Sequence, residues 1–183
     1  VCPDGSQPGE LAAIRFQVRA MLPEDHDGQL NSYVPRPFPF IGGYRAFLSC
    51  VRGERPLDAV LGAMEDSGLR GLGGAGFPAG RKWRIVRAEP APRLMAVNVD
   101  EGEPGTFKDR HYLERDPHRF LEGILIAAWA VGSDDVYVYL RDEYAACRAI
   151  LTREIAALAA DPPCPLPRIH LRRGAGAYIC GEE

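Results

Sequence analysis

One stretch decides how this sequence folds: residues 71–83, Gly-Leu-Gly-Gly-Ala-Gly-Phe-Pro-Ala-Gly-Arg-Lys-Trp. Five of its first ten residues are glycines, at positions 71, 73, 74, 76 and 80. Glycine adopts positive φ and lets a ligand approach the main chain closely. Consecutive N–H groups in such turns form concave sites for anions. We therefore expect this loop to bind a ligand that carries phosphate.

The glycine spacing does not identify the ligand. From Gly71 it matches G-x-G-x-x-G, but in dinucleotide-binding folds that motif follows a strand. Here the preceding residues 56–69 carry apolar side chains at helical spacing and a Ser-Gly helix stop. The P-loop pattern fails as well, because no glycine directly precedes Lys82 and no Ser or Thr follows it. A glycine-rich turn without a ligand is the alternative.

Strands alternate with helices in the rest of the chain. The spacing of apolar residues predicts helices over residues 56–69, 118–131 and 143–160, and strands over residues 93–99, 135–140 and 168–172. This alternation indicates an α/β fold with a mostly parallel sheet flanked by helices. Ligands of such sheets bind beyond the carboxyl ends of the strands, where the turns 98–103 and 174–183 fall.

Residues 1–41 differ in composition from the rest of the chain. They are rich in proline and turn residues, with one stretch, residues 10–21, whose apolar spacing predicts a helix. We interpret residues 1–41 as an N-terminal extension or the end of a preceding domain. The sequence ends on Glu183 in mid-pattern, so we expect residues 42–183 to be the N-terminal part of a longer ligand-binding domain and such a fragment to be inactive alone.

Composition excludes several classes of protein. The 183 residues are 46% hydrophobic and 26% charged, which is typical of a globular protein. A net charge of −3 offers no basic surface for nucleic acid, and no apolar run reaches the length of a membrane span. The five cysteines include no C-x-x-C pair, so we expect no metal site, no disulfide framework and a cytoplasmic location.

The polar residues of the three loops suit a phosphorylated cofactor with an aromatic ring. Lys82 would add positive charge beside the glycine loop, and Asn98 could hydrogen-bond a heterocycle or a ribose. Phe77, Trp83 and Tyr178 could stack on a planar ring. Acidic residues in turns are more often helix caps or solvated charges, so the carboxylates do not by themselves indicate a reaction.

Four motifs in this order resemble a known family. They are residues 42–44, 67–83, 98–110 and 174–183, the third reading Asn-Val-Asp-Glu-Gly-Glu-Pro-Gly-Thr-Phe-Lys-Asp-Arg. Together they resemble the flavin-carrying, NADH-oxidising 51 kDa-type subunit of respiratory complex I. That family includes the flavin subunits of NAD-reducing hydrogenases and of soluble NAD-dependent formate dehydrogenases. The resemblance covers residues 42–183.

The resemblance implies a function and a set of site residues. The cofactors would be FMN and NAD(H), with hydride passing between nicotinamide and flavin, and electrons leaving to iron–sulfur clusters in other subunits. The implied flavin and nucleotide contacts are Gly71, Gly73, Gly74, Gly76, Phe77, Lys82, Asn98, Asp100, Glu101, Tyr178, Gly181, Glu182 and Glu183. Glu103, facing the nicotinamide, and Glu183, near the nucleotide, would be the residues closest to the chemistry.

The resemblance also has limits. Leu72 stands where complex I proteins usually have arginine, which makes the β subunit of formate dehydrogenase the most similar branch. The family's [4Fe–4S] cysteines have no counterpart among these residues, so the cluster is expected only in a full-length parent protein. The implied protein is cytoplasmic or held at the inner face of a membrane through a larger complex. The alternative is a non-redox nucleotide-binding or assembly domain that retains the glycine loops.

Overall fold

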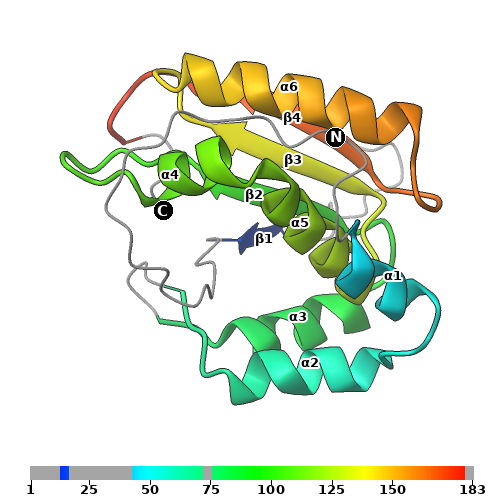
Figure 1. Ribbon diagram of the computed structural model, residues 1–183. Coiled ribbons are helices and arrows are strands. Elements are labelled where there is room, and N and C mark those ends of the chain that lie inside the picture. The colour runs from blue at the N-terminus through cyan, green and yellow to red at the C-terminus, as the bar shows by residue number, and fades with distance from the viewer. Residues whose placement is uncertain (1–12, 17–42, 72–75, 180–183) are drawn as a thin grey trace, which may run out of the picture.

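The centre of the molecule is a parallel sheet (Figure 1). The computed structural model describes residues 13–16, 43–71 and 76–179. Four strands lie in the order β1-β2-β3-β4, and each neighbouring pair is parallel. Their bounds are β1 Ala13–Phe16, β2 Leu94–Val99, β3 Asp135–Leu140 and β4 Arg168–Arg173. The predicted α/β fold with a mostly parallel sheet is confirmed.

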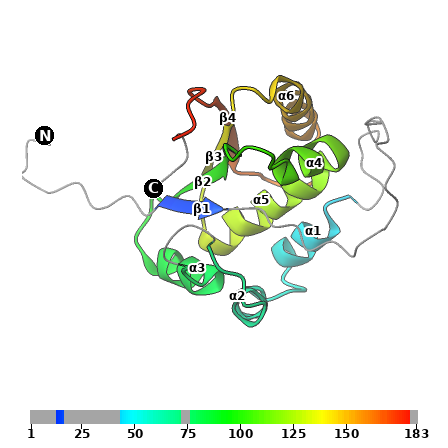
Figure 2. The ribbon, with the colours of Figure 1, turned by 90° about the vertical axis from the view of Figure 1, so that its left-hand side faces the viewer.

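Six helices occur in the described ranges. They are α1 Arg45–Val51, α2 Leu57–Asp66, α3 Ala79–Ala88, α4 Lys108–Arg115, α5 Pro117–Val131 and α6 Ala145–Ala160. Figure 2 shows α4, α5 and α6 on one face of the sheet, and α2 with α3 beside its β1 edge. The helices predicted over residues 56–69, 118–131 and 143–160 are therefore confirmed, with ends shifted by at most three residues.

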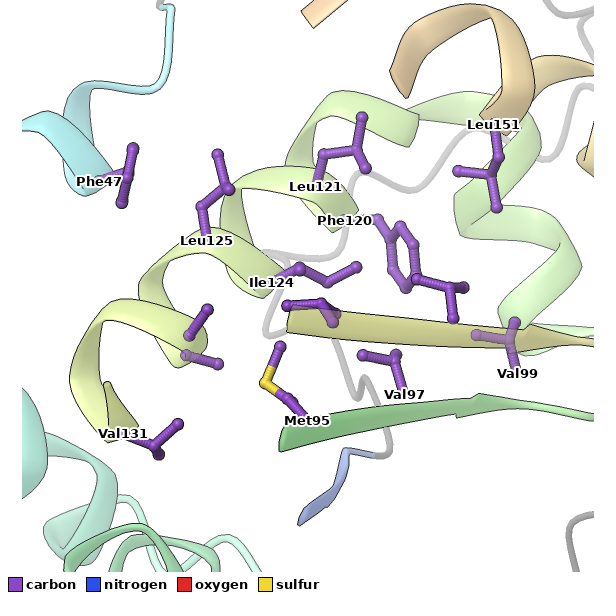
Figure 3. Packing of buried hydrophobic residues seen from close by; sticks show 14 of the residues in the cluster. Phe47, Met95, Val97, Val99, Phe120, Leu121, Ile124, Leu125, Val131 and Leu151 are labelled. Carbon is purple, nitrogen blue, oxygen red and sulfur yellow. The ribbon is translucent and has the colours of Figure 1, made fainter. Parts of the chain in front are cut away.

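The core lies between β2, β3 and α5. Alternate residues of β2, among them Met95 and Val97, are fully buried because successive strand side chains point to opposite faces. Figure 3 shows them beneath α5, whose Ile124 and Leu121 are also fully buried. Burying one such side chain contributes about 1.5–3 kcal/mol to stability. This packing fixes the sheet that carries the candidate site.

Helix α5 has clear sequence signals at both ends. The carboxylate of Asp116 accepts a hydrogen bond from the main-chain N–H of Arg119 at 3.2 Å, which is the usual N-cap arrangement. Pro117 follows in the first turn, where its missing N–H costs nothing. Gly132 ends the helix with φ of 70°, a left-handed conformation that glycine adopts without strain.

A buried hydrogen-bonded group ties α1 to α5 and α6. Tyr44, which precedes α1, and His118 are both 3% exposed, and the Tyr44 hydroxyl lies 2.9 Å from His118 Nδ1. His118 Nε2 lies 3.2 Å from a carboxylate oxygen of Glu154 on α6. The three side chains therefore form a chain of close polar contacts in the interior, where buried polar groups need neighbours of this kind.

The N-terminal helix prediction is wrong over residues 13–16. These residues form β1, which pairs in parallel with β2 so that Ala13 lies opposite Leu94 and Phe16 opposite Val97. The physical reason is the free edge of β2, whose main-chain groups need hydrogen-bond partners that a helix could not supply. The boundary placed at residue 41 stays a prediction, although residues 13–16 belong to the sheet.

Gly80 has a packing role rather than a ligand-binding one. It lies in the first turn of α3, and a Cβ at this position would come within 2.6 Å of the main-chain nitrogen of Glu65 on α2. That distance leaves no room for any side chain. Helices α2 and α3 therefore approach closely because position 80 is glycine.

We expect Gly80→Ala to lower the free energy of unfolding by about 1–3 kcal/mol, because backbone has to move to admit the methyl group. Gly62→Ala is the matched control: Gly62 lies inside α2, and a Cβ there would meet nothing within 4 Å. The control should raise stability by up to about 1 kcal/mol, because alanine favours helix. Urea unfolding of both variants checks this, and equal stability of the two would contradict it.

Candidate functional site

The carboxyl ends of three strands lie in one row. In the register of the sheet, Val99 pairs with Leu140, and Leu140 pairs with Arg173. The turns 98–103, 141–144 and 174–178 therefore leave the sheet from the same edge. Figure 1 shows that the ends of α2 and α3 that flank the glycine loop lie on this side of the molecule. All four connections thus face one region.

The turns after β3 and β4 are joined directly. The main-chain N–H of Gly174 donates to the carbonyl of Leu140 at 2.7 Å. The Arg173 guanidinium donates to the carboxylate of Asp142 and lowers the pKa of that carboxyl. A Cβ on Gly174 would lie 3.0 Å from the Leu140 oxygen, so this contact favours glycine.

The turns after β2 and β4 also meet. A Cβ on Gly102 would come within 3.2 Å of the carbonyl oxygen of Tyr178. The Tyr178 side chain is 64% exposed, which leaves its ring available for a ligand. The remaining predicted residues of this turn, Gly181, Glu182 and Glu183, lie outside the described residues.

Asp100 carries a buried oxygen atom that lacks a partner. Its main-chain N–H donates to the side-chain oxygen of Asn98 at 3.0 Å, which tightens the turn. Its Oδ2 atom is buried and has no hydrogen-bond partner among the described residues. Burial raises the pKa of Asp100, and the nearby Arg141 offsets only part of this effect. A buried carboxylate oxygen without a donor is costly, so this position is suited to a ligand that brings one.

Glu101 is buried and surrounded by donors. Its carboxylate accepts hydrogen bonds from the main-chain N–H groups of Asp109 and Arg110 at the start of α4 and from the hydroxyl of Tyr144 at 2.9 Å. The ammonium of Lys108 lies 3.3 Å away. Burial alone would raise the pKa of Glu101, but these hydrogen bonds and the Lys108 charge outweigh burial and lower it.

The predicted contact between Glu101 and a flavin stays a prediction, and it would require the carboxylate to change its hydrogen bonds. Its side chain has no exposed surface, and a direct contact would require the carboxylate to leave the partners just described. Lys108 is the first residue of α4, and its ammonium also lies 3.0 Å from the Asp109 carboxylate.

Glu103 differs from Glu101. It is exposed, and its carboxylate forms no hydrogen bond or ion pair with the residues that the structure describes. It lies in the same turn as Asp100 and Glu101, close enough for its charge to contribute to the raised pKa of Asp100. Its carboxylate is therefore the accessible one of this turn.

The base of the glycine loop is closed by main-chain contacts. The N–H of Gly71 donates to the carbonyl of Phe77 at 3.0 Å, and Arg70 forms an isolated antiparallel bridge with Pro78. Gly76 has φ of 55°, a left-handed conformation suited to glycine. Gly73 and Gly74 lie outside the described residues. The ends of the loop are thus held at the start of α3.

Two predicted residues flank this loop with side chains available for a ligand. Phe77 is 37% exposed, with the guanidinium of Arg81 lying 5.7 Å from the centre of its ring. Lys82 lies half-buried in the first turn of α3. Within the described part of the chain its ammonium forms no hydrogen bond or ion pair. A cation and a helix N-terminus together suit a phosphate.

Residues 64–183 match the family described as the Nuo51 FMN-binding domain, Complex1_51K. The chain belongs to this family. It is 44% identical over 151 residues to one of the NADH-quinone oxidoreductase subunits of Rhizobium meliloti, a match that covers 78% of this chain and 36% of that protein. It is 43% identical to the mitochondrial NADH-ubiquinone oxidoreductase 51 kDa subunit of Neurospora crassa, over 69% of this chain and 28% of that protein.

A solved structure is similar as well. The NAD+-reducing [NiFe]-hydrogenase in the H2-reduced state matches with a TM-score of 0.65 and 42% identity, over 75% of this chain and 24% of that chain. The chain thus spans about a third of the length of these curated relatives and a quarter of the hydrogenase chain. The resemblance to the flavin-carrying proteins of complex I is confirmed.

The residues of this Nuo51 FMN-binding domain fit the cofactor in its description. Asp100 presents a buried acceptor without a donor, and FMN carries ring and ribityl groups able to donate. Lys82 presents a cation without a described partner, and FMN carries a phosphate. The exposed Tyr178 ring lies beside the turn that holds Asp100. Each feature is one that a bound flavin would satisfy.

Two residues of this domain were missed by sequence reasoning. The main-chain N–H of Arg141 donates to the carbonyl of Val99 at 3.1 Å, and its guanidinium donates to the carbonyl of Glu101. Tyr144 donates to the carboxylate of Glu101. Both follow β3, and the only available signal was their position just after a predicted strand.

Proposed function

We propose that this chain binds FMN at the carboxyl edge of its sheet and takes part in hydride transfer between NAD(H) and that flavin. The observation that carries the proposal is the buried, unpartnered Oδ2 atom of Asp100, in a turn that meets the Tyr178 turn. Membership of the Nuo51 FMN-binding family supports the choice of flavin over other ligands.

Each residue would have a distinct part. Asn98 and Asp100 would orient the flavin by hydrogen bonds, and Lys82 would pair with its phosphate. Glu103, the accessible carboxylate of its turn, would lie at the nicotinamide side. The flavin, once bound, supplies the ring that accepts a hydride and releases electrons singly. The protein's contribution is position and electrostatics, with no side chain required as a general base.

We infer a multi-subunit electron-transfer enzyme as the setting. The relatives are named NADH-quinone oxidoreductase and NAD+-reducing hydrogenase, and partners that carry iron–sulfur clusters suit both names. The five cysteines show no cluster spacing, so a [4Fe–4S] centre belongs elsewhere in such an enzyme. We propose a formate dehydrogenase or an NADH:quinone oxidoreductase as the parent enzyme. Leu72, with the sequences of residues 80–83 and 100–106, favours the formate dehydrogenase branch.

A location in the cytoplasm, or at the inner face of a membrane within a larger complex, is part of the proposal. In the ranges that the structure describes, no helix combines the length and apolar character needed to cross a membrane.

The test is the visible absorption spectrum of the native assembly that contains this chain, recorded without oxygen before and after NADH is added. We expect flavin bands that bleach on addition of NADH. A preparation that carries no flavin, even after reconstitution with FMN, would overturn the proposal and favour the non-redox nucleotide-binding domain. Flavin that does not bleach with NADH would retain the cofactor and exclude the hydride transfer.

A further inference from the structure

The segment between β3 and α6 holds the main chain on both sides of Asp100. The N–H of Arg141 donates to the carbonyl of Val99 at 3.1 Å, and the Arg141 guanidinium donates to the carbonyl of Glu101. Val99 and Glu101 are the immediate neighbours of Asp100. One arginine therefore holds the carbonyl groups of both residues that flank Asp100.

Tyr144 holds the same turn through a side chain. It is 7% exposed, and its hydroxyl donates to the Glu101 carboxylate at 2.9 Å. That carboxylate also accepts from the first N–H groups of α4. The Glu101 side chain is thus held between α4 and the start of α6, which limits rotation of the turn.

Arg141 is itself held in place. Its side chain is 24% exposed, its guanidinium pairs with the Glu143 carboxylate at 3.1 Å, and it lies 5.5 Å from the centre of the Tyr144 ring. An arginine with several fixed contacts loses little freedom when a ligand binds. Its charge also acts on Asp100, where it opposes the effect of burial on the carboxylate.

We propose that Arg141 and Tyr144 are positioning residues of the flavin site, which set the orientation of Asp100 by holding the turn at Val99 and Glu101. This inference rests on the proposed function. Neither residue need touch the cofactor. Because a bound group tolerates little misplacement of its polar contacts, loosening the turn weakens flavin binding, and removing the Arg141 charge makes the reduced, more negative flavin less stable.

The experiment uses the native assembly with Arg141→Gln, Arg141→Lys or Tyr144→Phe. FMN affinity is measured by quenching of flavin fluorescence on reconstitution, and the midpoint potential by redox titration. We expect Arg141→Gln to weaken FMN binding about tenfold and to shift the potential to a more negative value. Tyr144→Phe should weaken binding about threefold to tenfold and leave the potential unchanged, while Arg141→Lys should restore the potential.

Tyr44→Phe is the matched control. It removes another buried tyrosine hydroxyl with a hydrogen-bond partner, 2.9 Å from His118. Tyr44 precedes α1, which lies on the side of the molecule opposite the carboxyl ends of the strands (Figure 1). It should lower thermal stability without changing FMN affinity or potential. Equal effects of Tyr44→Phe and Tyr144→Phe on FMN affinity would overturn the inference in favour of a purely structural role.

The remaining outcomes separate this inference from the proposed function. A wild-type assembly that binds no FMN would overturn both. A wild-type assembly that binds FMN and bleaches with NADH, while its Arg141 and Tyr144 variants match it in affinity and potential, would overturn the inference alone. If Arg141→Gln fails to assemble, Arg141→Lys and Tyr144→Phe, which preserve charge or volume, decide the question through FMN affinity.

Discussion

Replacing Glu101 by alanine is expected to lower the free energy of unfolding by about 3 kcal/mol. The carboxylate is buried and accepts from the main-chain N–H groups of Asp109 and Arg110 and from the Tyr144 hydroxyl. Alanine would leave these donors without an acceptor in a place that water cannot easily reach, and it would open a cavity. The large effect follows from the number of donors that depend on one side chain.

The same carboxylate predicts a dependence on pH. The pKa of Glu101 is lowered in the folded protein from its ordinary value of 4.5. A lowered acid pKa means that the folded state binds its proton less readily, so its stabilising contribution is complete above pH about 4.5 and is lost as pH falls below that value. Glu101→Ala should therefore flatten the stability profile below pH about 5.

Urea unfolding at several pH values measures both effects. Glu101→Gln keeps an acceptor but not the charge, and should lose less stability than alanine. Glu54→Gln is the surface control, because Glu54 is exposed and its ion pair with Arg52 is long, at 4.0 Å. Its effect should stay within about 0.5 kcal/mol. If Glu101→Ala lowers the free energy of unfolding no more than Glu54→Gln does, the Glu101 carboxylate does not form these hydrogen bonds in solution.

The fold was largely predictable because each element carries its own periodic signal. Strand β3 was predicted with its observed bounds, Asp135–Leu140, and α5 has a capping Asp116 and a terminal Gly132 in the sequence itself. Strand β1 was not predictable in this way. Its conformation is set by the main-chain edge of β2, about eighty residues away, and no pattern of side chains within residues 10–21 reports that edge.

The sequence predicted which turns form the site, but not which way the side chains in those turns point. The turn that carries Asp100 could be located because it follows a buried strand. Whether an acidic side chain in that turn faces the interior or the ligand depends on contacts that turn patterns do not report: the start of α4, which has to fold back over the turn, and Tyr144, which lies beyond the next strand. Gly80 is a second example. Its glycine-rich surroundings predicted a ligand-binding loop, whereas the structure shows that glycine is needed there because α2 and α3 pack closely.

Replacing Asp100 by asparagine is expected to change ligand binding and stability in opposite directions. Asp100 Oδ2 is buried without a partner among the described residues, and burial raises the pKa of the carboxyl. The charged form therefore destabilises the flavin-free fold, and a neutral amide of the same shape should raise its stability by about 1 kcal/mol. FMN affinity should fall by a factor of about 10–100, because a hydrogen bond to a charged acceptor is lost.

The opposite signs distinguish a ligand-binding residue from a structural one. An acid whose carboxylate is fully hydrogen-bonded within the protein, as that of Glu101 is, loses stability when it is neutralised. An acid whose buried oxygen has no donor destabilises the protein until a ligand supplies one. The raised pKa adds a further sign. The contribution of Asp100 to the stability of the flavin-free wild type should decrease as pH rises from about 3.8 through its folded pKa, so the difference in stability between Asp100→Asn and the wild type should grow over that range. Thermal unfolding with and without FMN measures both quantities on one sample. If Asp100→Asn lowers the stability of the flavin-free protein as well as its affinity for FMN, Asp100 is part of the scaffold, and the flavin is held by other groups.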